Sequence, residues 1–462
     1  HGVLELARTC RMPIQRIGMR SPGSGISNLQ SYQAFKDNYL IPYKQNLAEK
    51  FKSAYTLFQS DRGGVIYEPE IGIHENIAEV DFASMYPCIM VKHNISPETI
   101  LCSCCKNKAV PGLNYNICKT KGLIPKVLEP IIKRRLYYKS HPTKINNARK
   151  TALKWILVTC FGYMGFKKSK FGRIEAHEAI NAFAREKLLQ ATKLLEQNNF
   201  KILHGIIDSL WITKPNIKEK EVQTMCKEIE KATSLPITFE GMYHWMVFLP
   251  SVINNKIPVP SRFFGLYKNN TFKLRGIEVR KRDTPKIVYD MQSDMLNILQ
   301  TIKNKIEYEA AIPQIIRILK QYAATLNKSI PAEDLLIKRR LSKLNYTSSI
   351  PQKIISKKLI NQGITLNPGN SIKYIIKDIQ SVVKEKKFIT LEEYNGNFDK
   401  EKYRELLIKA TTSLLQPFHF SNEALLHAIE EEKQLTLQES GIQTTLPLQK
   451  PPQSISHHAT IS

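Results

Sequence analysis

The stretch Glu79–Ile89, EVDFASMYPCI, decides the fold that we expect for this chain. The apolar residues before Asp81 predict the end of a strand, and the small, turn-prone residues after it lead to Tyr86 and Pro87. An isolated acid at the end of a strand is most often a surface residue or a helix cap. A functional role for Asp81 therefore depends on whether the rest of the chain supplies partners for it.

The composition is that of a globular protein with polyanionic partners. The 462 residues are 42% hydrophobic and 24% charged, and such a length suggests about three domains or subdomains. The 68 Lys and Arg outnumber the 41 Asp and Glu, so the formal net charge is +27. Because basic residues neutralise phosphates and release counterions, this excess favours nucleic acid over a membrane surface. A basic protein without a specific polyanionic partner is the alternative.

The sequence carries no sign of membrane insertion or secretion. No run approaches the ~18 apolar residues of a membrane span, and no N-terminal segment has the pattern of a signal peptide. The chain begins at His1 rather than Met, so we expect a fragment of a longer protein. Eight Cys in 462 residues do not make a secreted disulfide scaffold.

The segment Phe200–Thr213, FKILHGIIDSLWIT, predicts two apolar strands around a tight turn. It contains a second acid, Asp208, which is costly to bury in an apolar hairpin unless a cation or hydrogen-bond donors compensate its charge. This cost favours a functional role for Asp208 over that of a turn residue. We expect His204 to be a packed residue rather than a metal ligand.

Helices are expected on either side of these strands. His1–Pro13 is helix-like, Arg20–Ser27 has the composition of a loop, and Asn28–Pro42 predicts an amphipathic helix that ends at the proline. Lys121–Lys139 is expected to be helical after Pro125. Asn147–Lys187 is also expected to be largely helical. Its residues Lys154, Val158 and Phe161 are spaced i, i+4 and i+7 and share one helix face, and this pattern by itself indicates a core face with a lysine at its edge.

These segments resemble the polymerase domain of the B-family DNA polymerases. The residues that follow Asp81 are similar to motif A, D-F-x-S-L/M-Y-P-x-I. Lys154 and Gly162 match motif B, K-x-x-x-N-S-x-Y-G, but Val158 and Phe161 replace its Asn and Tyr.

The hairpin at 200–213 is similar to motif C, Y-x-D-T-D-S, through Asp208. His204, Ile206 and Ile207 replace the Tyr, the first Asp and the Thr of that motif. The altered motifs B and C are most similar to a divergent archaeal paralogue, a group sometimes described as inactivated.

The resemblance implies an α+β fold of the right-hand polymerase type. It has an antiparallel-sheet palm, helical-hairpin fingers and a mostly helical thumb. It places the palm at 63–120 and 191–285, the fingers at 121–190 and the thumb at 286–440. Residues 1–62 are similar to the segment that follows a proofreading exonuclease domain, and 441–462 have the composition of a disordered tail.

The resemblance also implies template-directed DNA synthesis, in which a dNMP is transferred to a primer 3′-hydroxyl by a two-metal mechanism. The expected catalytic residues are Asp81 and Asp208, and together with the backbone carbonyl of Phe82 they are the expected ligands of two Mg²⁺ ions. Arg135 and Lys154 are expected on the triphosphate, and Tyr86 beneath the sugar, where it excludes a 2′-hydroxyl. The expected nucleotide-binding residues are Ser84, Met85, Tyr86, Arg135, Lys154 and Phe161.

The expected DNA contacts come from a Gly-Gly loop, from a strand pair at 261–285 that is similar to the family's primer grip, and from the thumb. They are Gly63, Gly64, Arg262, Arg275, Lys281, Arg282, Arg339 and Lys343.

Primer-template DNA and dNTPs are the expected partners, with a sliding clamp or another replication or repair factor as a candidate and no membrane. We expect a cytoplasmic, nucleoid-associated protein. The altered motifs imply slow, low-fidelity synthesis without proofreading in this chain. The alternative is a catalytically inactive polymerase-like protein that binds primer-template DNA as a scaffold or accessory factor.

A cluster of cysteines needs a separate explanation. Cys102, Cys104, Cys105 and Cys118 could supply four thiolates to zinc, although their spacing differs from that of common zinc knuckles. Some thermophilic members of the family carry a disulfide at about this place, which would correspond to Cys105 and Cys118. Zinc, a disulfide and free thiols stay open, each in a structural role. The other cysteines, Cys10, Cys88, Cys160 and Cys226, are expected to be small buried hydrophobes.

Overall fold

The computed structural model describes residues 1–43 and 51–439, so the tail expected at 441–462 lies outside the described residues. The chain divides into two compact units. Unit 1 is His1–Gly276 with Lys303–Lys305, and unit 2 is Ile277–Ile302 with the residues from Ile306 onward. The boundary falls inside 191–285, which the family resemblance assigns to one region.

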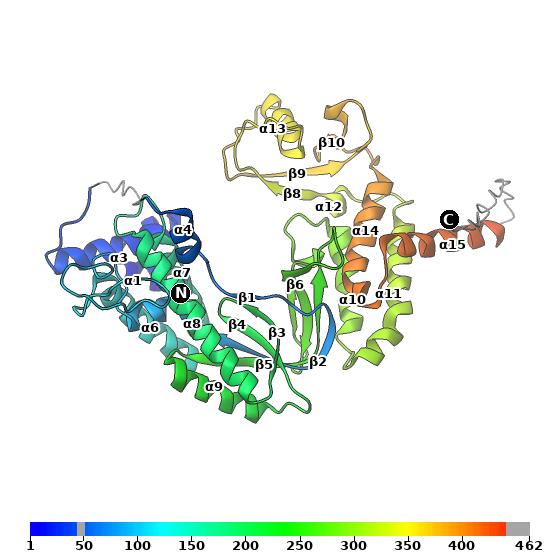
Figure 1. Cartoon of the computed structure of the whole chain (residues 1–462). Helices are drawn as coiled ribbons and strands as arrows, with labels where there is room; N and C mark the ends of the chain where they lie inside the picture. Colours follow the sequence, from blue (N-terminus) through cyan, green and yellow to red (C-terminus); the bar gives the residue numbers. More distant parts are fainter. Residues whose placement is uncertain (44–50, 440–462) are drawn as a thin grey trace, which may run out of the picture. The chain divides into compact units, whose positions relative to one another are not determined.

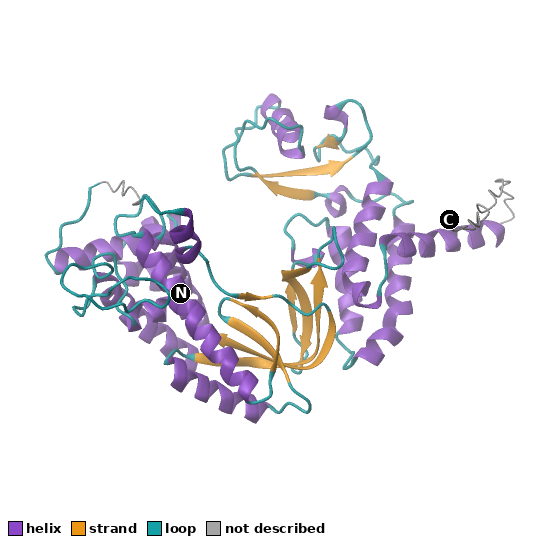
Figure 2. Ribbon diagram, viewed as in Figure 1, coloured by secondary structure: helices purple, strands orange, loops and turns teal. Residues whose placement is uncertain are grey.

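Unit 1 is built around a curled antiparallel sheet of seven strands in the order β1-β3-β4-β2-β5-β6-β7 (Figures 1 and 2). The central strand β2 pairs with β4 on one side and β5 on the other, so the strand that ends in the EVDF sequence lies in the middle of the sheet. The hairpin predicted at 200–213 and the strand pair predicted within 261–285 are confirmed. The strands are β1 Ile66–Tyr67, β2 Gly72–Phe82, β3 Lys201–Ile206, β4 Ser209–Thr213, β5 Ile237–Pro250, β6 Pro258–Tyr267 and β7 Phe272–Arg275.

Helices cover this sheet and extend from it. Helices α8 and α9 pack on one another and against the sheet, while α6 and α7 pack together and contact α1 and α3 (Figure 1). A large apolar core joins β2, β4 and these helices. The helices of unit 1 are α1 Gly2–Cys10, α2 Ile14–Met19, α3 Pro22–Lys36, α4 Ala54–Ser60, α5 Met85–Lys92, α6 Leu123–Ser140, α7 Lys144–Met164, α8 Ile174–Gln197 and α9 Glu219–Thr233.

The prediction of a loop at Arg20–Ser27 is wrong, because most of this segment is helical. Helix α3 begins at Pro22, a residue that suits the first helical turn, and it ends at Lys36 rather than at Pro42. Its glycines serve close packing instead of a turn. A Cβ at Gly23 would lie 1.8 Å from the Tyr163 hydroxyl of α7, so no larger residue fits between the two helices as they are placed.

Unit 2 combines helices with a three-stranded antiparallel sheet in the order β10-β9-β8. The predicted helix-rich character of this region is confirmed, and the basic segments at 337–346 and 369–378 supply the paired strands β8 and β9. The elements are α10 Lys286–Leu299, α11 Lys305–Thr325, α12 Ala332–Leu335, α13 Pro351–Asn361, α14 Lys400–Leu415, α15 Asn422–Glu439, β8 Ile337–Arg340, β9 Ser371–Ile376 and β10 Phe388–Ile389. Short 3₁₀ turns lie at Glu278–Arg280, Lys384–Lys386 and Gln416–Phe418.

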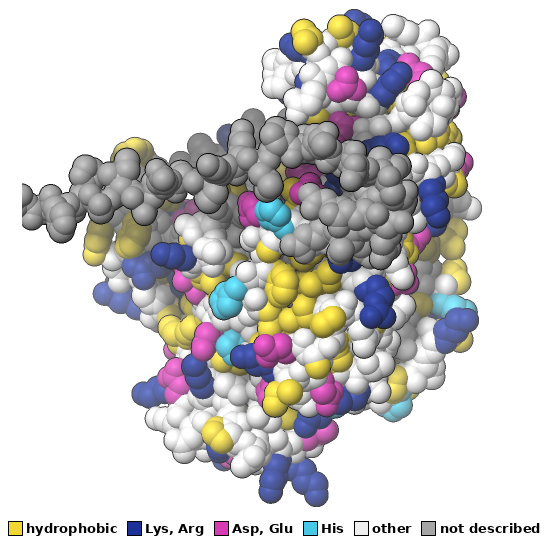
Figure 3. Space-filling model, turned by 90° about the vertical axis from the view of Figure 1, so that its right-hand side faces the viewer, with side chains coloured by type: hydrophobic (Ala, Val, Ile, Leu, Met, Phe, Trp, Pro, Cys, Tyr) yellow, Lys and Arg dark blue, Asp and Glu magenta, His cyan; other side chains and the backbone are white. Residues whose placement is uncertain are grey.

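Lys and Arg side chains are interspersed with acidic and hydrophobic ones on the face shown in Figure 3. Within residues 1–43 and 51–439, no helix has the length and apolar character needed to cross a bilayer.

Candidate active site

The two aspartates singled out in the sequence lie together on neighbouring strands. Asp81, near the end of β2, is the register partner of Ser209 on β4. Asp208 precedes Ser209 in the turn between β3 and β4, and its backbone carbonyl accepts a hydrogen bond of 2.8 Å from the N–H of Phe82. Antiparallel pairing of β2 with β4 thus joins two acids that are far apart in the sequence.

Both carboxyl groups are largely withdrawn from water. Burial and then the charge of Asp208 raise the pKa of Asp81 to about 7, although a hydrogen bond of 2.5 Å from Ser209 opposes the rise. Burial also raises the pKa of Asp208, against its own backbone N–H and the charges of Lys154 and Lys273. A divalent cation would remove the cost of holding two such carboxylates ionised, and carboxylate oxygens are the ligands that Mg²⁺ prefers.

The turn that carries Asp208 has an unusual backbone. Ile207 has a φ of +57°, a left-handed conformation that is strained for a β-branched residue. Its N–H donates to the carbonyl of Val65 at 3.0 Å, which ties the turn to the chain before β1. The preceding Ile206 is half-buried and packs against an apolar cluster that includes Trp211 and Tyr243, so an apolar side chain stands where motif C has its first acid.

Arg135 approaches the aspartates from helix α6. Its Nη1 donates to the Ser84 hydroxyl at 2.6 Å, and Ser84 itself precedes α5 in a left-handed conformation. Burial lowers the pKa of the guanidinium, while Cys88, Asp81 and Glu240 oppose this effect. The buried Nε of Arg135 has no hydrogen-bond partner among the described residues, so this side chain retains donor capacity for an anion.

Tyr86 belongs to a stack of three rings. It lies on Phe161 of α7 with centroids 3.9 Å apart and an interplanar angle of 16°, and Phe161 lies on His177 of α8 at 4.4 Å. Burial and the charge of Asp208 raise the pKa of the Tyr86 hydroxyl to about 12. The side chain of neighbouring Met85 is buried in the core. Lys154 is exposed on α7.

The Gly-Gly loop lies beside the same residues. Gly63 has a φ of +61°, and its carbonyl accepts a hydrogen bond of 2.7 Å from Arg185 of α8. A Cβ at Gly64 would lie 3.0 Å from Ile207 and 3.4 Å from the Tyr86 hydroxyl. A side chain at Gly64 would therefore press on both the Asp208 turn and the Tyr86 ring.

The basic residues predicted to contact DNA are divided between the units. In unit 1, Arg262 donates to the Pro250 carbonyl at 2.6 Å, and Arg275 is exposed at the end of β7.

In unit 2, Lys281 and Arg282 are exposed next to the 3₁₀ turn, and Lys281 pairs with Glu278 at 2.8 Å. Arg339 pairs with Asp283 at 2.8 Å. Exposed Lys343 lies 5.6 Å from the centroid of the Tyr346 ring.

Sequence reasoning missed a buried polar cluster beside the aspartates, which we call the Glu79 cluster: Glu79, Tyr243, Tyr267 and Lys273. Glu79 is 1% exposed and accepts hydrogen bonds from both tyrosine hydroxyls, that of Tyr267 at 2.7 Å, and from the Lys273 ammonium. Glu79 and Asp81 alternate along β2, and that E-V-D pattern could have indicated two acids on one face of a strand.

Glu240 of β5 was also missed. Its charge raises the pKa values of Asp81 and Arg135, and its carboxylate lies 3.6 Å from the ammonium of Lys139 on α6.

By contrast, the prediction for His204 is confirmed, because this ring is fully buried and stacks on Trp211 with ring centroids 5.0 Å apart. The four cysteines outside the cluster are buried as predicted.

A model of DNA polymerase family B matches residues 32–418. The chain belongs to DNA polymerase family B. The resemblance stated from motifs A, B and C is confirmed at the level of the family.

Relatives of this family B chain include two curated archaeal enzymes. It is 33% identical over 304 residues to DNA polymerase 2 of Saccharolobus solfataricus, and the aligned region covers 65% of this chain and 45% of that protein. It is 27% identical over 456 residues to DNA polymerase 1 of Pyrococcus abyssi, and this aligned region covers 94% of this chain and 56% of that protein. The chain thus spans about half the length of these relatives.

The fold has a solved counterpart. The structure of the family B DNA polymerase from the hyperthermophilic archaeon Pyrobaculum calidifontis aligns with a TM-score of 0.63 at 21% identity, covering 89% of this chain and 53% of that one. The predicted α+β class with an antiparallel sheet is therefore confirmed.

Proposed function

We propose that this protein carries out template-directed DNA synthesis, transferring a dNMP from a dNTP to a primer 3′-hydroxyl. The observation that carries the proposal is the convergence of Asp81 and Asp208 at one point of the sheet, with burial raising both pKa values. Membership of DNA polymerase family B supports DNA synthesis as the class of reaction.

Asp81, Asp208 and the backbone carbonyl of Phe82 would hold two Mg²⁺ ions. When bound, such ions lower the pKa of an attacking hydroxyl and neutralise the leaving phosphates. The carboxylate donor set fits hard divalent cations. Burial disfavours the ionised form of both acids and so raises their pKa values, and a bound cation would offset that cost of ionisation.

The remaining residues of the site would bind and orient the nucleotide. Arg135, with a buried Nε left for an anion, and the exposed Lys154 would hold the triphosphate, together with the backbone at Ser84 and Met85. Tyr86 would lie beneath the deoxyribose and exclude a 2′-hydroxyl by steric contact, braced by Phe161 behind it.

In this proposal the seven-stranded sheet is the palm, α6 and α7 are the fingers, and unit 2 is the thumb. Primer-template DNA would contact Gly63, Gly64 and the basic residues predicted from the sequence, and a sliding clamp or another replication or repair factor is a candidate partner. Phe161 in place of a motif B tyrosine would make synthesis less accurate, and the loss of the first motif C acid would make it slow.

Two observations favour a second function, that of a catalytically inactive protein that binds primer-template DNA as a scaffold. Ile206 packs into an apolar cluster where motif C has an acid, and Val158, in place of the motif B asparagine, is 53% exposed. The site then has one fewer carboxylate for cations than motif C supplies.

Primer extension by the full chain tests the proposal against this alternative. We expect extension in Mg²⁺ that either Asp81→Ala or Asp208→Ala abolishes, with primer-template binding retained in both variants. Binding of primer-template by the unmodified chain without extension in Mg²⁺ or Mn²⁺ would overturn the enzymatic proposal and support the scaffold.

A further inference from the structure

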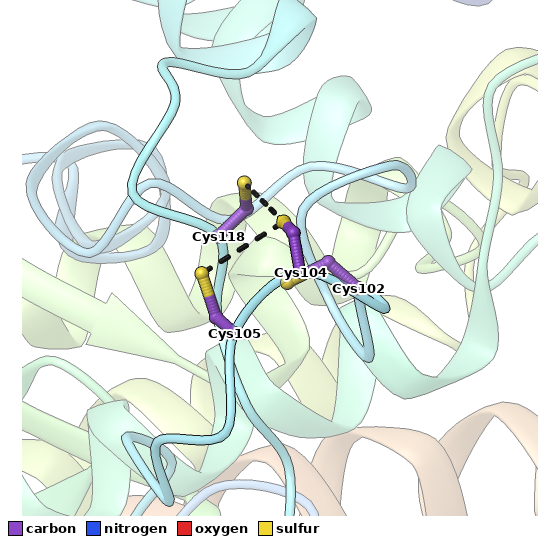
Figure 4. A group of neighbouring side chains, drawn as sticks. All are labelled: Cys102, Cys104, Cys105 and Cys118. Carbon is purple, nitrogen blue, oxygen red and sulfur yellow. Dashed lines mark hydrogen bonds between the residues drawn. The ribbon is translucent and has the colours of Figure 1, made fainter.

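Four cysteines meet in the connection between α5 and α6, away from the aspartates. The sulfur atoms of Cys102, Cys104, Cys105 and Cys118 all lie within 4.8 Å of one another. Cys104 Sγ lies 3.5 Å from Cys118 Sγ and 3.8 Å from Cys105 Sγ, and the side chains converge from two passes of the loop (Figure 4). The spacing in the sequence left zinc, a disulfide and free thiols open.

The distances favour a metal ion. Zinc bound by four thiolates at about 2.3 Å in a tetrahedron places its sulfur atoms about 3.8 Å apart, close to the separations seen here. A disulfide would draw two sulfurs to about 2.05 Å and leave the other two thiols without a role. All eight cysteines, each within the described residues, are free thiols, and four of them share one small volume.

The surroundings suit a thiolate site. Asn116 donates from Nδ2 to the carbonyl oxygens of Cys102 at 2.7 Å and Cys105 at 2.5 Å, and to the sulfur of Cys102 at 3.4 Å. Such contacts orient the chain around metal ligands.

Charge balance points the same way. A zinc ion with four thiolates carries a net charge of about −2, which nearby cations must compensate. Three exposed lysines lie close to the cysteines in the sequence, and they are Lys106, Lys108 and Lys119; the next one, Lys121, pairs with Glu129.

The cluster is joined to the start of helix α6. Cys118 donates its N–H to the Thr99 carbonyl at 2.8 Å, and Ile100 pairs with Ile117 in an isolated bridge. The Asn94 side chain donates to the Cys118 carbonyl at 2.8 Å and accepts at 2.8 Å from the N–H of Gly122, the residue that precedes α6. An ion at the cluster would therefore fix the loop to the base of the helix that carries Arg135.

We propose that Cys102, Cys104, Cys105 and Cys118 bind one structural zinc ion as a tetrathiolate that closes the loop between α5 and α6. Binding replaces the four thiol protons, which pass to solvent, and changes the oxidation state of neither sulfur nor metal. The site does not touch the proposed catalytic residues, and its role is to hold the loop and the start of α6 in place.

Metal analysis of the untagged full chain, purified without chelators, tests the proposal. We expect about one equivalent of zinc per chain, falling to near zero in Cys104→Ser and Cys118→Ser. The matched control is Cys226→Ala, which removes a buried cysteine elsewhere in unit 1 and should keep the zinc.

A second measurement needs no variant and so does not depend on the folding of one. Replacement of the metal by Co²⁺ in the unmodified chain should give the intense visible absorption of a tetrahedral thiolate site. A metal-free chain with eight titratable thiols, a Cys105–Cys118 disulfide found by mass spectrometry, or iron in place of zinc would each overturn the assignment. These readouts need no DNA synthesis, so they can fail or succeed independently of the proposed polymerase activity.

Discussion

Ser209 donates a hydrogen bond of 2.5 Å to Asp81 across the β2–β4 pair, and the residue before Ser209 is Asp208. One register of two strands therefore positions both acids. Because side chains alternate along a strand, a shift of one residue would turn Asp81 to the other face of the sheet. The site depends on strand pairing as much as on the identity of its carboxylates.

Neutralising Asp81 should stabilise the protein while it abolishes synthesis. A folded-state pKa raised to about 7 means that the ionised carboxylate disfavours folding, so stability falls as pH rises from about 4 through 7 in the absence of divalent ions. At pH 8, Asp81→Asn should raise the free energy of unfolding by about 2 kcal/mol, as measured by urea titration in a chelator. Asn keeps an oxygen that can accept from Ser209.

Asp208→Asn should shift stability in the same direction, since burial raises the pKa of Asp208 as well. Addition of Mg²⁺ should stabilise the unmodified chain more than either variant. A lower free energy of unfolding for Asp81→Asn than for the unmodified chain at pH 8 would contradict this account of the site.

Removing the Tyr86 ring should admit ribonucleotides. The ring is held in place by Phe161 at 3.9 Å, so it cannot easily move aside for a 2′-hydroxyl. Tyr86→Ala should raise incorporation of rNTPs relative to dNTPs by roughly tenfold or more, measured as the ratio of kcat/KM values in single-nucleotide extension. Tyr86→Phe keeps the ring and the stack and should leave the ratio unchanged. Equal discrimination by the Ala and Phe variants would rule out a steric role.

Restoring a hydroxyl at Phe161 should improve accuracy. Phe161 lies between Tyr86 and His177, where the related motif has a tyrosine that can donate a hydrogen bond near the new base pair. Phe161→Tyr should therefore lower the frequency of misinsertion opposite a defined template base. Phe161→Leu, which removes the stack without adding a donor, is the comparison, and an unchanged error frequency in Phe161→Tyr would count against the idea.

A half-buried imidazole, that of His93, should make the fold sensitive to mild acid. His93 stacks on Phe183 at 3.8 Å, and burial, followed by the charges of Lys187 and Lys92, lowers its pKa from 6.5 to about 4. The neutral His93 ring contributes fully to the free energy of unfolding above pH 6.5. This contribution is lost as pH falls toward 4, because the unfolded chain binds the proton first.

Between pH 7 and pH 5 the unmodified chain should therefore lose about 1 kcal/mol more stability than His93→Phe, which keeps the stack. Urea unfolding at the two pH values measures the difference, with exposed His141→Gln as the control. An equal loss in the unmodified chain and His93→Phe would show that His93 does not titrate in this way.

The sequence predicted those parts of the molecule that depend on local pattern. The hairpin around Asp208 and the strand pair β6–β7 follow from apolar runs with turn residues between them. Helix α3 was missed at its start because Pro22, Gly23 and Gly25 have the composition of a loop, whereas contact with α7 selects the small residues. That contact has no signal within the segment itself.

The candidate site shows the same limit. The proximity of Asp81 and Asp208 was predicted from the resemblance to family motifs, not from their separation in the sequence. The Glu79 cluster joins β2, β5, β6 and β7, so no single segment contains enough of it to be recognised. The left-handed Ile207 is likewise imposed by the strands on both sides of the turn, against the preference of a β-branched residue.

The Glu79 cluster should be strongly coupled. Lys273→Met alone would leave the Glu79 carboxylate buried without its cation, which should cost about 3 kcal/mol of unfolding free energy. Glu79→Gln alone should cost less, because Lys273 is 26% exposed and can reach solvent. The double variant should therefore lose less than the sum of the two single losses in a double-mutant cycle.

The exposed pair Lys201–Glu70 provides the matched control, since its side chains are 63% and 49% exposed and its cycle should give under about 1 kcal/mol. Lys273→Met should also move the acid limb of the primer-extension pH profile upward, because the charge of Lys273 opposes the raised pKa of Asp208. Additive losses together with an unmoved pH profile would show that the Glu79 cluster neither stabilises the sheet by pairing nor acts on the aspartates.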